Sequence, residues 1–195
     1  MNDAALFEAT VPVFRHYLRR IEALLARLSD EQEPLLRRTL APGAFSAGEH
    51  LGTALGFVAR TLAPLLRRDV PALEGEGADR RALIRLVRRV RALLDDALPH
   101  EFDGASERRV RHTAGEAAIE QDATTFVTVF ALPNFFFHLA MAFAILRGAG
   151  IDLGKADFDD QHVYPAGATP RIGPVSEAAA ARPSGRRAGS AAPQE

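Results

Sequence analysis

The stretch from Phe126 to Leu146 reads FVTVFALPNFFFHLAMAFAIL and carries no charged side chain. As a single helix of about 31 Å it would match the hydrocarbon thickness of a bilayer. A proline at mid-span, and Asn134 and His138 one helical turn apart, are unfavourable inside lipid. A segment that is apolar all round is also typical of a helix enclosed by other helices of a soluble protein. We therefore predict an enclosed core helix, with a membrane anchor formed by Phe126–Leu146 as the alternative.

Three other segments have the periodicity of amphipathic helices, with an apolar residue every three or four positions. Pro12 interrupts the first, so this helix should either kink there or begin near Thr10 as its N-cap. Ser46 and Glu49 have the spacing of a capping box at the start of the second helix, and Asp79 can cap the third. The three helices are expected over residues 4–28, 46–67 and 79–97.

The run from Arg108 to Glu120, RRVRHTAGEAAIE, has no helical period and predicts a short β-hairpin that turns at Ala114 and Gly115. Asp122 then caps the last helix. Three amphipathic helices and one apolar helix favour an all-α fold, a four-helix bundle. We expect this bundle to be one domain over residues 1–164. Residues 165–195 are rich in Pro, Ala, Gly, Ser and Arg, which predicts a disordered, flexible tail.

Composition excludes several classes of function. The chain has 24 basic and 25 acidic residues and a net charge of −1, which gives no support for a nucleic-acid partner. It has no cysteine, so disulfides, thiolate nucleophiles and zinc-thiolate sites are excluded. The N-terminal sequence lacks the basic start, apolar centre and cleavage site of a secretory signal, and we therefore expect a cytoplasmic protein.

Gly48, Gly52 and Gly56 recur every four residues along the second helix. Glycine at this spacing lets another helix approach closely, either within the monomer or across a homodimer interface. Homodimers are the commonest assembly of soluble chains, so a homodimer is a candidate quaternary structure.

Several motifs make the chain resemble a known superfamily. They are Val11–Phe14 (VPVF), Leu40–Phe45 (LAPGAF) and Phe130–His138 (FALPNFFFH), together with the sequence that follows the last of these as far as Phe158. In this order they resemble a bacterial branch, of unknown function, of the DinB-like superfamily, whose members are four-helix bundles regarded as metalloenzymes. The resemblance spans residues 4–160 and implies the same bundle as the periodicity.

The resemblance also implies a metal site. Better-known members of the superfamily hold a divalent metal with three histidines, one on the second helix and two spaced by four residues on the last. Some use it to activate a low-molecular-weight thiol in transferase or isomerase reactions. His50 and His138 match this pattern, whereas Asn134 and Ala142 stand four residues to either side of His138. Since zinc or nickel would be expected to take imidazole ligands, the implied triad is incomplete.

Asn134 and His138 permit two interpretations. They could form a polar pocket for a small-molecule ligand inside an otherwise apolar core. Alternatively, Asn134 could satisfy backbone groups left unpaired by Pro133, with His138 a hydrogen-bonded core histidine. The predicted ligand pocket comprises Asn134, His138, Phe137, Met141 and Phe57.

These patterns lead to one predicted function and one enzymatic alternative. We predict a metal-free protein that binds a small ligand or a partner near Asn134 and His138. The alternative is a divalent-metal-dependent enzyme, similar to the thiol transferases or isomerases, that uses His50 and His138. The other histidines are expected to be exposed; they are His16, His100, His112 and His162.

Overall fold

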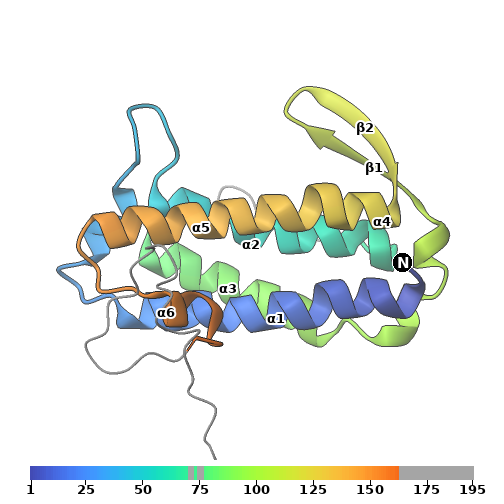
Figure 1. The fold of residues 1–195 in the computed structure, drawn as a ribbon, viewed down its shortest axis with the longest axis horizontal. Coiled ribbons are helices and arrows are strands. Elements are labelled where there is room, and N and C mark those ends of the chain that lie inside the picture. Colours follow the sequence, from blue (N-terminus) through green and yellow to red (C-terminus); the bar gives the residue numbers. More distant parts are fainter. Residues whose placement is uncertain (70–72, 74–76, 163–195) are drawn as a thin grey trace, which may run out of the picture. The chain divides into compact units, whose positions relative to one another are not determined.

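The computed structural model describes residues 1–69, 73 and 77–162 of the chain, and the tail predicted for residues 165–195 lies outside them. The described part is mainly helical, with one two-stranded antiparallel sheet (Figure 1). The long helices are α1 (Asp3–Arg27), α2 (Ala47–Leu66), α3 (Arg80–Asp95) and α5 (Leu132–Gly148). The strands β1 (Arg109–Ala114) and β2 (Ala117–Asp122) precede the last long helix. The predicted all-α bundle with a β-hairpin is confirmed.

Shorter helical segments connect these elements. They are η1 (Glu33–Arg37), η2 (Pro99–Phe102), η3 (Ala105–Glu107) and α6 (Lys155–Asp159). Two more, α4 (Ala123–Thr125) and the π-helical η4 (Phe126–Ala131), run directly into α5. Together α4, η4 and α5 make one helix from Ala123 to Gly148.

The start of α1 differs from one of the two expectations. The side chain of Asn2 caps the helix by accepting a hydrogen bond from the backbone N–H of Ala5 at 2.9 Å. Thr10 is therefore an interior residue and not the N-cap, and its hydroxyl donates to the carbonyl of Leu6 at 2.7 Å. Pro12 is accommodated inside the helix. The cap forms earlier because Asn2 supplies an acceptor for the free N–H groups of the first turn.

The other predicted caps are confirmed. Ser46 N–H donates to Glu49 Oε2 at 2.7 Å and Glu49 N–H donates to Ser46 Oγ at 3.3 Å, which completes the capping box of α2. Asp79 accepts from the backbone N–H of Ala82 at 2.8 Å at the start of α3. Asp122 caps α4 in the same way. Each of these helices thus begins where a short polar side chain satisfies its free N–H groups.

The hairpin β1–β2 and the loop before α2 both project from the helical bundle (Figure 1). The hairpin β1–β2 pairs Ala114 with Ala117, and Gly115 turns the chain with φ at +60°. At the other end, the loop before α2 is closed by a bridge between Thr39 and Ser46. Figure 1 shows both projecting from the same side of the bundle.

The helix Ala123–Gly148 is less enclosed than its composition predicts. Phe135 and Leu139 are buried, but Val129 is 66% exposed and Phe137 is 56% exposed. Only 39% of its most apolar window is buried. Among the described residues this is the one helix with the length and hydropathy of a membrane span, a test that core helices also pass. The helix has one buried and one exposed face, because α1 and α2 contact it on the side of Phe135 and Leu139.

Candidate functional site

His50 and His138 meet where α2 packs along α5. The Nδ1 atoms of the two rings lie 2.9 Å apart, within hydrogen-bond distance. His50 is buried at 5% exposure and His138 is half-buried. His50 lies in the first turn of α2, which the capping box at Ser46 fixes, and His138 lies in the first half of α5. The structure thus brings together the two histidines that the superfamily resemblance singled out.

Three phenylalanine rings surround this histidine pair. The ring of Phe45 lies 5.6 Å from that of His50 and 6.1 Å from that of His138, between ring centroids. Phe57 stacks on His138 at 5.9 Å, and Phe137 meets His50 edge-on at 6.1 Å. The imidazoles therefore lie in apolar surroundings that disfavour a charged ring.

Both imidazoles are neutral at pH 7. Burial, together with a smaller effect of the nearby His50, lowers the pKa of His138 from its usual 6.5 to about 4. Burial also lowers the pKa of His50, against a smaller opposing effect of the Glu49 carboxylate. Two adjacent neutral rings can hydrogen-bond only if one Nδ1 carries the hydrogen and the other accepts it.

The remaining ring nitrogens of the pair are the two Nε2 atoms. Within the described part of the chain, no hydrogen bond joins Nε2 of His50 or of His138 to another residue. A neutral imidazole that donates from Nδ1 has a bare Nε2, and one that accepts at Nδ1 carries its hydrogen on Nε2. The pair therefore presents one hydrogen-bond acceptor and one donor, and exchange of tautomers would reverse the two roles.

Asn134 is engaged by its own helix. Its side-chain amide donates to the backbone carbonyl of Phe130 at 2.7 Å. Pro133, the residue before it, follows the π-helical segment η4, and such segments are frequent at functional sites. This hydrogen bond agrees with the interpretation in which Asn134 satisfies a backbone group near the proline.

The donor set does not fit the three-histidine metal site that the superfamily resemblance implies. His50 and His138 supply two nitrogens, but the third position is Asn134, whose amide is bonded to Phe130. Among the described residues, no group of three or more His, Cys, Asp or Glu side chains could hold a metal ion. A zinc site takes at least three protein ligands, so the described residues supply one too few at this position.

A cavity of about 480 Å³, lined by residues of α2, of the segment before α3 and of α3, adjoins the histidine pair at Phe45. Phe45 borders both, because its ring contacts the two imidazoles and also lines the cavity. Gly52 and Gly56 also line the cavity, and a Cβ at Gly56 would meet nothing within 4 Å. Gly48 differs, since a Cβ there would come within 2.2 Å of the Ala78 carbonyl oxygen. The close approach expected of these glycines is thus made within the chain at Gly48.

The other predicted pocket residues are near the pair but not all enclosed. Phe57 is buried at 5% exposure, Met141 is half-buried, and Phe137 is more than half exposed. Neither these residues nor Asn134 line the 480 Å³ cavity.

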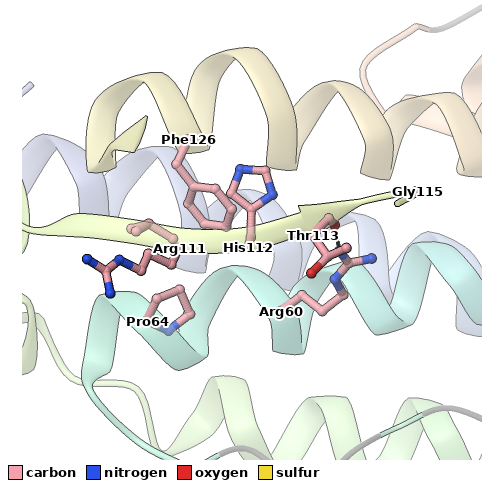
Figure 2. A pocket seen from close by; sticks show the side chains of 8 residues that line it. Arg60, Pro64, Arg111, His112, Thr113, Gly115 and Phe126 are labelled. Carbon is pink, nitrogen blue, oxygen red and sulfur yellow. Dashed lines mark hydrogen bonds between the residues drawn. The ribbon is translucent and has the colours of Figure 1, made fainter. Parts of the chain in front are cut away.

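A second cavity, of about 540 Å³, lies between the hairpin and α2. Figure 2 shows β1 passing between Phe126 above it and the α2 residues Arg60 and Pro64 below. Arg111 and His112 line it from β1. No motif in the sequence indicated this cavity.

His112 and His16 correct the expectation that the remaining histidines are exposed. His112 is half-buried, with its ring centroid 4.1 Å from that of Phe130, and its Nε2 lies 3.0 Å from Gln121 Oε1. His16 Nε2 lies 2.8 Å from the carbonyl oxygen of Asp159. The alternation of β1 could have indicated that His112, two residues after the buried Val110, points to the same side.

Comparison with known proteins identifies the family and the fold. A family model described as Domain of unknown function (DUF1993) matches residues 6–159. The crystal structure of a DinB family member protein from Shewanella denitrificans superposes with a TM-score of 0.68 at 20% sequence identity. The match covers 84% of this chain and 97% of that one. No curated protein matches the sequence. At this identity the structural similarity concerns the fold.

Proposed function

We propose that this chain, which belongs to the DUF1993 family and has the DinB-like fold, is a metal-free protein that binds a small organic ligand beside Asn134 and His138. The observation that carries the proposal is the contact between two neutral imidazoles, His50 and His138, at 2.9 Å inside a ring of phenylalanines. Such a pair offers one hydrogen-bond donor and one acceptor in apolar surroundings, as small-molecule sites do.

The chemistry of the pair indicates the kind of ligand group it would bind. A donor and an acceptor side by side are complementary to a group that has both, such as a carboxylic acid in its neutral form, a primary amide or an alcohol. The rings of Phe45, Phe57 and Phe137 favour an apolar body next to that group. The 480 Å³ cavity beyond Phe45 has the size of a small-molecule site.

A divalent metal is the second candidate ligand, and the same 2.9 Å distance supports it. Because both rings are neutral, each can turn a lone pair toward a zinc or nickel ion. Such an ion would need its remaining ligands from outside the described residues. A thiol-transferase or isomerase activity would also need an external thiol, since the sequence has no cysteine.

Metal analysis separates the two candidates. We expect the purified protein to contain no stoichiometric metal, and its melting temperature to stay unchanged when zinc or nickel is added after chelation. His16→Ala serves as the control, because His16 lies on α1 away from the pair. One metal per chain that disappears in both His50→Ala and His138→Ala, but stays in His16→Ala, would overturn the metal-free proposal.

Ligand binding at the pair can be followed by NMR of the imidazole groups. Small amides, carboxylic acids and alcohols are added one at a time, and we expect the His50 and His138 resonances to move together while that of His100 does not. In His138→Gln the shift at His50 should be lost. If no compound of these three classes moves either resonance, the proposed ligand site is wrong.

A further inference from the structure

The cavity between the hairpin and α2 is basic. Arg60, Arg111 and His112 are among its lining residues, and no acidic side chain lines it. It differs from the histidine pair, where both titratable groups are neutral at pH 7. The two sites are neighbours nevertheless, because Phe57 contacts both His138 and the Arg60 guanidinium.

Arg60 is held in place without an acidic partner. Its guanidinium lies 4.7 Å from the centre of the Phe57 ring and 5.9 Å from that of Phe130. It also donates to the backbone carbonyl of Thr113 on β1 at 2.8 Å. Among the described residues no carboxylate forms an ion pair with it. A guanidinium has five N–H groups, so several donors remain for a ligand.

Arg111 on β1 brings a second guanidinium to the cavity. Arg111 and Arg109 share a single carboxylate, that of Glu120, at 2.5 Å and 3.2 Å. Arg109 also lies opposite Asp122 in the strand register, so a second carboxylate is available to it. The Arg111 side chain is 86% exposed, and such surface pairs hold a guanidinium only weakly. Arg111 is thus free to turn toward a ligand in the cavity.

We propose that this cavity is a binding site for a small organic anion whose phosphate or carboxylate group is held between Arg60 and Arg111. A volume of about 540 Å³ accommodates a metabolite-sized molecule. Guanidinium groups match both kinds of anion by forming paired hydrogen bonds. Phe126 and Pro64 provide apolar walls for the rest of the ligand. Arg60 also lines the 480 Å³ cavity beside the histidine pair, whereas Arg111 lines the hairpin cavity and not that one, so Arg111 distinguishes the two sites.

Calorimetric titration of the full chain with inorganic phosphate and with succinate tests the site. The two titrations, in a buffer free of other polyvalent anions, distinguish a phosphate-selective from a carboxylate-selective site. We expect at least one anion to bind, and Arg60→Gln and Arg111→Gln each to weaken binding by about tenfold. Arg60→Lys keeps the charge and should retain part of the affinity.

Arg88→Gln is the matched control, because Arg88 is exposed on α3 and does not line the cavity. It should bind as the unmodified chain does. The Arg111→Gln variant should fold normally, because so exposed a side chain contributes little to stability. A loss of anion binding in this variant therefore cannot be attributed to misfolding. The proposal is wrong if neither anion binds at millimolar concentration, or if Arg88→Gln weakens binding as much as the two cavity variants.

Discussion

The helix Ala123–Gly148 has two faces of nearly the same composition and opposite environments. On one face Phe135 is 1% exposed and its ring lies 5.0 Å from that of Phe14 on α1. On the other face Phe137 is 56% exposed. Two phenylalanines separated by one residue thus have different roles, which shows that apolar composition alone does not determine burial. His138 lies between the two faces, where the half-buried environment lowers its pKa.

Phe135→Ala should have the largest effect on stability. Removing a fully buried ring leaves a cavity between α5 and α1, and we expect a loss of about 3–5 kcal/mol in the free energy of unfolding. Urea unfolding followed by circular dichroism measures it. A loss below about 1 kcal/mol would mean that the inner face is not a packed core.

The free energy of unfolding should depend on pH because the pKa of the half-buried His138 is lowered in the folded chain. Its pKa is about 4 in the folded chain and about 6.5 in the unfolded chain, so between these values the unfolded state binds more protons. The stabilising contribution of the neutral ring is therefore complete above about pH 6.5 and is lost as the pH falls to about 4. His138→Gln should show a shallower decline in this window than the unmodified chain. Equal declines would contradict the lowered pKa.

Asn134→Ala should have a moderate effect. It removes the hydrogen bond from the side-chain amide to the Phe130 carbonyl, and a partly buried bond of this kind contributes about 0.5–1.5 kcal/mol. If Asn134 instead binds the ligand directly, its removal would leave stability unchanged and abolish the NMR shift at His138. Comparing unfolding and ligand titration in the same variant separates these roles.

Phe137→Ala should have the smallest effect and is the matched control for Phe135→Ala. An exposed ring that touches His50 and His138 only at its edge should contribute less than about 1 kcal/mol. A loss as large as that of Phe135→Ala would show that the outer face is covered in solution, for example by a second copy of the chain. The oligomeric state of both variants, measured by light scattering, would then show whether a second copy of the chain covers this face.

Local features of the fold were predictable from the sequence. The capping box at Ser46 and Glu49, the cap at Asp79 and the turn at Gly115 each depend on residues within four positions of one another. A helix over residues 4–28 was one of two expectations and α1 confirms it, but its N-cap Asn2 was not identified, because Thr10 and Pro12 gave a second local signal farther along the chain. Where two local signals competed, the sequence did not decide between them.

The candidate sites were predictable only in part. A resemblance to the DinB-like superfamily drew attention to His50 and His138, but it concerned a metal site whose third ligand this chain lacks. The basic cavity was missed because Arg60 and Arg111 come from elements far apart in the sequence. Periodicity places each on its own element and does not show that the hairpin folds back over α2.

The sequence by itself determined the four long helices, the caps at Ser46, Asp79 and Asp122, and the hairpin, because these depend on hydrogen bonds and periodicities within a few residues. The tertiary structure decided which face of Ala123–Gly148 is covered, that two imidazoles meet at 2.9 Å, and that Arg60 lies beneath the hairpin. The physical reason is that burial and pKa depend on what packs against a side chain. The partners of this last helix lie many residues away along the chain.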